Sequence, residues 1–174
     1  MEKEILYVIC ENVNDAKLVF DEQREMYTMS GYKVDSRKLI LNSEMVLNLV
    51  EKEKDYTCTI KWLSPYDPEC FEKISKDFNY IEVIYADMLS GTFDFIQELV
   101  KLVGKDKVYL RTMMHPTNGF SVCELANILN KINVVYGNFE IKTAFTDEWY
   151  TELDINEMSG IVNLMSESEA EEEM

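Results

Sequence analysis

Short apolar runs alternate with longer segments of helical periodicity along most of this 174-residue chain. Residues 5–10 form a continuous apolar run, which is typical of a strand buried on both faces. The next segment repeats apolar residues at helical spacing from Val13 to Tyr27, and Gly31 favours its end. Further strands are predicted at 39–41, 56–63, 81–86 and 108–114.

Each later helix is predicted from a residue that commonly begins one. Ser43, Thr92 and Ser121 can accept hydrogen bonds from backbone N–H groups in a first turn. Pro68 after Asp67 fits a first helical position, because proline has no N–H to leave unpaired. These signals predict helices over 44–50, 67–78, 93–103 and 122–132.

The alternation predicts an α/β fold, a three-layer αβα sandwich on a mainly parallel sheet of five or six strands, as in flavodoxin-like proteins. Alternating apolar residues predict an extra, half-exposed edge strand near 139–145, and residues 147–165 could form a last short helix. We expect a single domain over 1–165. Residues 166–174 carry five glutamates, and this crowding of charge predicts a disordered tail.

The net charge narrows the choice of partners. The chain has 17 Lys plus Arg against 33 Asp plus Glu, a formal charge of −16, and its basic residues are scattered. Direct nucleic-acid binding is not expected, because that affinity rests on basic groups displacing counterions. A protein partner with a basic surface fits better. No apolar stretch approaches transmembrane length and no secretory signal is evident, so we expect a cytoplasmic protein that does not bind membranes.

The four cysteines are far apart in sequence. Cys10, Cys58, Cys70 and Cys123 form no Cys-x-x-Cys pair, and one histidine cannot complete a zinc site of normal spacing. We expect free, mostly buried thiols, and no cofactor is predicted.

Candidate site residues follow the predicted strands, because ligands of open α/β sheets bind at the carboxyl ends of the strands. Glu11, Asp67 and Asp87 could together bind Mg²⁺, although carboxylates are common in so acidic a chain. His115 is the only imidazole, so it would carry any histidine acid–base chemistry, or it could simply cap its turn. Glycine-rich phosphate-binding motifs and a serine-hydrolase elbow do not occur. Cys10 lacks a phosphatase arginine six residues on, where Ala16 stands, and is expected in the core.

Over residues 5–132 the order of elements resembles the receiver domain of two-component response regulators. The resemblance is carried by the strand over 5–12 with its acidic end, by Gly-Tyr-Lys-Val at 31–34, by Trp-Leu-Ser-Pro at 62–65, by Leu-Ser-Gly at 89–91 and by His-Pro at 115–116. It implies a receiver-like sheet whose strand ends would normally accept a phosphoryl group.

The departures from that family bear on function. Placed by the proline at 65, the phosphate-accepting aspartate is replaced by Lys61, and the acid pair after the first strand falls near Cys10 and Glu11. The family's lysine is replaced by His115, and its switch hydroxyl by Ala86 or Tyr85. The resemblance therefore implies a pseudo-receiver, which keeps the fold and binds partners without aspartyl phosphorylation.

Two classes of function remain open. The first is a non-enzymatic, acidic regulatory or inhibitory protein that docks on another protein, as a pseudo-receiver or as a phage-type anti-defence inhibitor that mimics nucleic-acid charge. Exposed aromatic residues would anchor such docking, although core packing explains aromatic residues at least as well. The candidates are Trp149, Tyr150, Tyr66 and Phe120. The second class is an enzyme, Mg²⁺-dependent or centred on His115, that acts on a phosphorylated small molecule or nucleotide.

Overall fold

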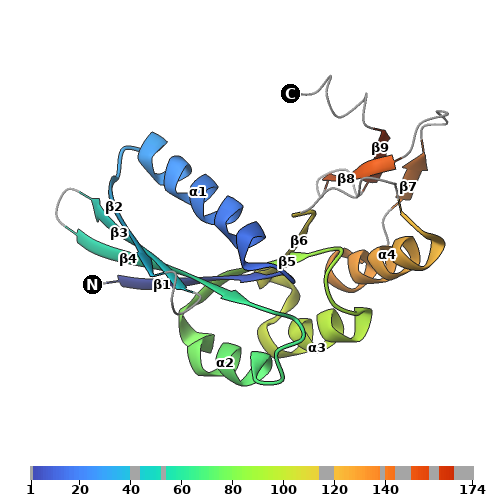
Figure 1. Ribbon diagram of the computed structural model, residues 1–174, viewed down its shortest axis with the longest axis horizontal. Helices are drawn as coiled ribbons and strands as arrows, with labels where there is room; N and C mark the ends of the chain where they lie inside the picture. Colours follow the sequence, from blue (N-terminus) through green and yellow to red (C-terminus); the bar gives the residue numbers. More distant parts are fainter. Residues whose placement is uncertain are drawn as a thin grey trace.

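The computed structural model of the chain describes residues 2–39, 44–51, 54–113, 120–137, 140–143, 150–156 and 161–166. Its main sheet has six strands in the order β2-β3-β4-β1-β5-β6 (Figure 1). The strands are β1 Glu2–Ile9, β2 Lys33–Leu39, β3 Glu44–Glu51, β4 Lys54–Leu63, β5 Ile81–Asp87 and β6 Val108–Arg111. The described α-helices are α1 Val13–Met29, α2 Cys70–Asp77, α3 Phe93–Val103 and α4 Val122–Tyr136. Short 3₁₀ turns, η2 Phe78–Tyr80 and η3 Lys105–Lys107, precede β5 and β6.

Strand β1 lies inside the parallel part of the sheet. It pairs in parallel with β4 on one side and with β5 on the other, and β5 pairs in parallel with β6. Counted along the chain, these four strands stand in the order 2-1-3-4, which is how doubly wound sheets of the flavodoxin type begin. The carboxyl ends of β1 and β5 are therefore neighbours.

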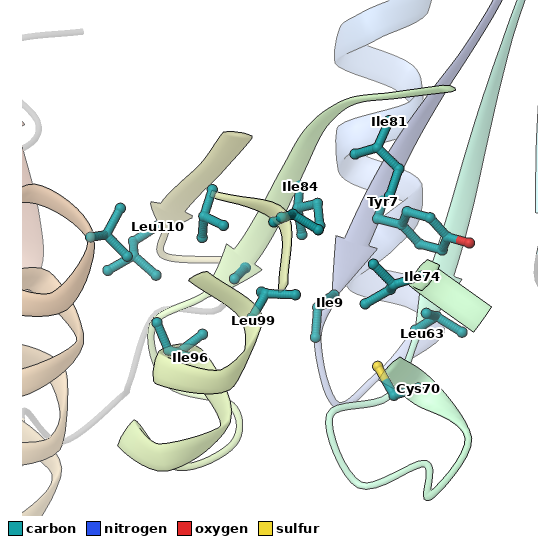
Figure 2. Packing of buried hydrophobic residues seen from close by; sticks show 14 of the residues in the cluster. Tyr7, Ile9, Leu63, Cys70, Ile74, Ile81, Ile84, Ile96, Leu99 and Leu110 are labelled. Atoms are coloured by element: carbon teal, nitrogen blue, oxygen red, sulfur yellow. The ribbon is translucent and has the colours of Figure 1, made fainter. Parts of the chain in front are cut away.

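Alternation along β1 divides the interior into two cores. Ile5, Tyr7 and Ile9 face the core that α2, α3 and α4 share, whereas Val8 and Cys10 face the core built with α1. Figure 2 shows the first core, in which side chains from the sheet meet those of the helices: Tyr7, Ile9, Leu63, Ile74, Ile96 and Leu99. Each large apolar side chain buried in this way stabilises the fold by about 1.5–3 kcal/mol. The sheet is thus the middle of three layers.

Polar residues begin three of the helices, as the sequence indicates. Asn12 accepts the N–H of Asn14 at 2.9 Å at the start of α1, and Thr92 caps α3. At α4, Ser121 and Glu124 form a reciprocal capping box, with bonds of 2.8 and 3.2 Å. These caps fix where each helix leaves its loop, and they set the positions of the loops at the sheet's carboxyl edge.

The prediction of a helix over 44–50 is wrong, because this segment is strand β3. Its apolar residues fit a helical spacing, but Met45, Leu47 and Leu49 also alternate as a strand requires. Strand β3 pairs antiparallel with both β2 and β4, along its whole length with β4. This long-range pairing satisfies the backbone on both sides and decides the conformation over local periodicity.

The segment after α4 also differs from the prediction. Strands β7 Glu140–Thr143, β8 Tyr150–Asn156 and β9 Ile161–Ser166 form a separate three-stranded sheet in the order β7-β9-β8. The extra edge strand near 139–145 is therefore wrong as an edge of the main sheet, because β7 pairs with β9. The helix over 147–165 is wrong too, since β8 and β9 pair antiparallel there. Residues 167–174, the main part of the predicted tail, lie outside the described residues.

The α/β class is confirmed, but the parallel part of the sheet has four strands where five or six were predicted. The physical reason is that the described chain after α4 enters the second sheet instead of adding a strand beside β6. The arrangement is compatible with a flavodoxin-like fold. In the part of the chain that the structure describes, no helix combines the length and the apolarity needed to cross a bilayer.

Candidate functional site

Asp87, the last residue of β5, lies at the centre of the loops on the carboxyl edge of the sheet. Its side chain is buried, and only 3% of the residue is exposed. Oδ1 accepts the backbone N–H groups of Leu89 and Met113, each at 3.3 Å, and Oδ2 accepts the Ser90 hydroxyl at 2.5 Å. Both carboxylate oxygens are therefore engaged, and they tie the loop after β5 to the segment after β6.

Ser90 extends this network to β1. Its Oγ donates to Asp87 and accepts the backbone N–H of Glu11 at 3.1 Å. Glu11 follows β1 with its side chain exposed, so its backbone belongs to the network and its carboxylate faces solvent. The structure thus brings two of the predicted residues, Glu11 and Asp87, to the same edge and links them through one hydroxyl.

A buried lysine of α4 bonds to the same loop. Lys131 of α4 is fully buried, and its Nζ donates to the carbonyl oxygens of Met88 at 2.8 Å and Ser90 at 2.9 Å. Burial lowers the pKa of Lys131 from 10.5 to about 8, and the negative charge of Asp87 partly opposes this shift. Lys131 therefore holds the loop after β5 through its backbone. We call Asp87, Ser90 and Lys131 the loop network.

Cys10 and Asp15 flank the loop network from the β1 side. Burial raises the pKa of the Cys10 thiol to about 12, and the negative charges of Asp15 and Asp87 add to the shift. The thiol is therefore protonated at neutral pH and poorly nucleophilic, and the prediction that Cys10 belongs to the core is confirmed. Burial, and then the charge of Asp87, raises the pKa of the Asp15 carboxyl.

Asp67 precedes α2, and its described hydrogen bonds stay within that turn and helix and do not reach the loop network. Its Oδ2 accepts Lys73 Nζ at 2.7 Å, and its Oδ1 accepts the N–H of Glu69 at 2.9 Å. The hydrogen bond from Lys73 lowers the pKa of Asp67. Because of this turn, the helix begins at Cys70 and not at 67, where it was predicted to begin. These contacts of Asp67 therefore do not join it to Glu11 and Asp87, with which it was predicted to bind Mg²⁺.

Two predicted site residues, His115 and Trp149, lie outside the described residues. Among the side chains that are described, no three of the His, Cys, Asp or Glu type gather as metal ligands would.

Lys61 lies on the α2 side of the sheet. The receiver resemblance placed this residue at the phosphate-accepting position. Its Nζ pairs with Asp77 Oδ2 at 2.6 Å, and the same oxygen accepts the Tyr7 hydroxyl at 2.7 Å. Burial alone would raise the pKa of Asp77, but the hydrogen bonds from Lys61 and Tyr7 outweigh it and lower the pKa. Lys61 therefore joins β4 to the end of α2.

Sequence reasoning missed Lys131. A signal was present, because this lysine occupies the apolar stripe of α4, between Ile128 and Val135 and next to Ile132. A charged residue on a buried stripe requires partners that the interior supplies, and here two carbonyl groups do so.

Comparison of the chain with protein-family models, with curated proteins and with solved structures gives no match. The fold and the loop network themselves therefore carry the functional argument.

Proposed function

We propose that this protein is a non-enzymatic, acidic regulatory or inhibitory protein that works by docking on a partner protein with a basic surface. The observation that carries the proposal is the state of Asp87. The carboxylate at the sheet's ligand-binding edge is buried, and three hydrogen bonds occupy its two oxygens. A carboxylate held in this way stabilises the loops and is poorly placed to ligate a metal ion.

The charge of the chain supports docking by attraction. At −16 for 174 residues, it raises the encounter rate with a positively charged protein surface and repels phosphate backbones. An inhibitor that competes with nucleic acid for a basic protein surface would use the same property.

The receiver resemblance fits the same proposal, with one change of register. The proline at 65 placed the acceptor position at Lys61. By strand order β5 is the third parallel strand, next to β1, and from this order we infer that Asp87, its terminal residue, corresponds to the acceptor instead. We infer a pseudo-receiver in which Ser90 and two backbone N–H groups hold that aspartate. Acetyl phosphate with Mg²⁺ should then leave the intact mass of the protein unchanged. Addition of one phosphoryl group, lost in Asp87→Asn, would contradict this inference.

The docking proposal is tested by thermal melting. A basic protein partner, captured from the native host and identified by mass spectrometry, should raise the melting temperature, because a ligand that binds only the folded state stabilises it. Mg²⁺ and nucleotides should leave the melting temperature unchanged. A nucleotide-dependent or Mg²⁺-dependent rise that His115→Ala or Asp87→Asn abolishes would favour the enzyme instead.

A further inference from the structure

On the α1 side of the sheet, β5 and β6 carry aromatic side chains that are partly exposed. Among the described helices, α1 alone contributes side chains to the core on this side of the sheet. Tyr85 of β5 packs at the margin of that core, and its register partner Tyr109 of β6 is 42% exposed, with the ring centroids 6.3 Å apart. We name as the open face five residues of α1, β5 and β6: Leu18, Met26, Tyr85, Tyr109 and Arg111.

The strip over β5 and β6 has the width of one helix. Neighbouring strands lie about 4.8 Å apart and a helix with its side chains is about 10 Å wide, so one helix covers about two strands. Helix α1 shares its core with side chains of β1, β4 and β5, whereas three helices share the opposite core. Figure 1 shows α1 on one side of the sheet and α2 and α3 on the other. Parallel sheets are normally covered on both faces, so the open face suits a second helix beside α1.

Hydrogen bonds hold α1 against β5 and β6 at the open face. Arg111 of β6 donates two hydrogen bonds to the Glu22 carboxylate of α1, at 2.8 and 3.0 Å, and its guanidinium lies 5.7 Å from the centre of the Tyr85 ring. The Tyr85 hydroxyl accepts Gln23 Nε2 at 3.2 Å. These bonds fix α1 relative to β5 and β6, so a partner meets a preformed surface and little ordering is lost on binding.

Apolar side chains of α1 flank that ion pair. Leu18, Glu22 and Met26 recur every four residues and therefore share one side of the helix, the side from which Glu22 reaches β6. Leu18 is 55% exposed and Met26 is 48% exposed. Together with Tyr109, they give the open face three exposed apolar or aromatic side chains, the kind of surface on which an amphipathic helix lays its apolar face.

Charge identifies the kind of helix. Helix α1 carries four acidic residues against Lys17 and Arg24, and Arg111 of β6 pairs with one of these acids. The open face therefore keeps a small excess of negative charge, and the whole chain is at −16. A second copy of the chain would bring like charges together, whereas Lys or Arg side chains would be attracted and could also stack on the exposed Tyr109 ring.

We propose that the open face binds a basic, amphipathic α-helix of a partner protein. The apolar stripe of that helix packs on Tyr109, Leu18 and Met26, and its Lys and Arg side chains pair with the acids of α1. This inference rests on the proposed docking function and names the surface and the partner's chemistry.

The test uses fluorescence anisotropy with the full chain and three synthetic peptides of about 18 residues, long enough to form a helix. The first has leucine on one helical face and lysine on the other. The second replaces lysine with glutamate, and the third scrambles the first so that no apolar face remains. Tyr109→Ser and Met26→Ser should each weaken binding of the first peptide by about tenfold. Tyr66→Ser is the matched control, because Tyr66 is 62% exposed in the loop after β4, and it should leave binding unchanged.

Four results would overturn this inference. They are equal binding of the scrambled peptide, equal effects of Tyr109→Ser and Tyr66→Ser, dimers in sedimentation that Tyr109→Ser dissociates, and a large gain in affinity on removal of residues 167–174. The last two would assign the open face to a second copy or to the chain's own end. None of these results touches the docking proposal itself, which fails separately if Mg²⁺ or a nucleotide raises the melting temperature and His115→Ala or Asp87→Asn abolishes that rise.

Discussion

At the scale of single residues, Lys131 has the most unusual environment in the described chain. Lysine is almost never fully buried unless it is paired, and here its partners are two backbone carbonyl groups. At neutral pH the ammonium group serves both carbonyl oxygens with two of its three N–H donors, and above about pH 8 the neutral amine keeps two donors and can still serve both without a buried charge. The positions of Glu11 and Asp87 could be predicted from strand ends, but the carbonyl groups that hold Lys131 exist only in the folded loop.

Because folding lowers the pKa of Lys131, the contribution of this residue to the free energy of unfolding depends on pH. The residue titrates near 10.5 in the unfolded chain and at about 8 in the fold, so between these values the folded state binds fewer protons. The contribution of Lys131 to the free energy of unfolding should therefore rise with pH across that window. Lys131→Met removes the titrating group, so urea unfolding of both proteins should show the wild type gaining stability relative to the variant. A difference that is constant or falls with pH would contradict the burial of a charged Lys131.

The cysteines differ in exposure, and alkylation measures that difference. Cys10, Cys58 and Cys70 are buried with pKa values raised to about 12, chiefly by burial, whereas Cys123 of α4 is exposed. Iodoacetamide should add one group to the native protein and four to the unfolded protein, as counted by intact mass. Cys123→Ser should abolish the native reaction, and rapid native labelling of a second thiol would contradict the packing of the two cores.

At the scale of elements, sequence signals were most informative where a local chemical group does the work. The caps at Thr92 and Ser121 were predicted correctly because the side chain itself bonds to the first turn. Strand β3 was misread because its pairing with β4 is a long-range interaction. The helix predicted over 147–165 was wrong for the same reason, because β8 and β9 form through their pairing with each other and not through a local signal.

The capping box of α4 offers a test at this scale. Ser121→Ala removes the acceptor for the Glu124 N–H and should lower the free energy of unfolding by about 1 kcal/mol. Ser75→Ala is the control, because that hydroxyl bonds to the Phe71 carbonyl on the exposed side of α2 and should change stability by less than about 0.5 kcal/mol. Equal losses in chemical denaturation would show that the cap does not stabilise α4.

At the scale of the whole molecule, the sheet follows the sequence pattern as far as β6 and then departs from it. The α/β class and the two-sided burial of β1 were predictable from the apolar run of residues 5–10. The end of the parallel sheet after four strands was not, because residues 139–145 alternate as well for a second sheet as for an added edge. The consequence is functional, since the uncovered strip over β5 and β6 exists only because no further strand and helix follow there in the described chain.

The central claim is that Asp87 is committed to the loops and is not free to ligate a metal ion or to accept a phosphoryl group. The most direct measurement is a Mg²⁺ titration of the ¹⁵N-labelled protein, observed at the amides of Glu11, Leu89 and Met113, which bond to Ser90 or Asp87. We expect these three resonances to stay in place. Saturable shifts of all three that disappear in Asp87→Asn would contradict the account.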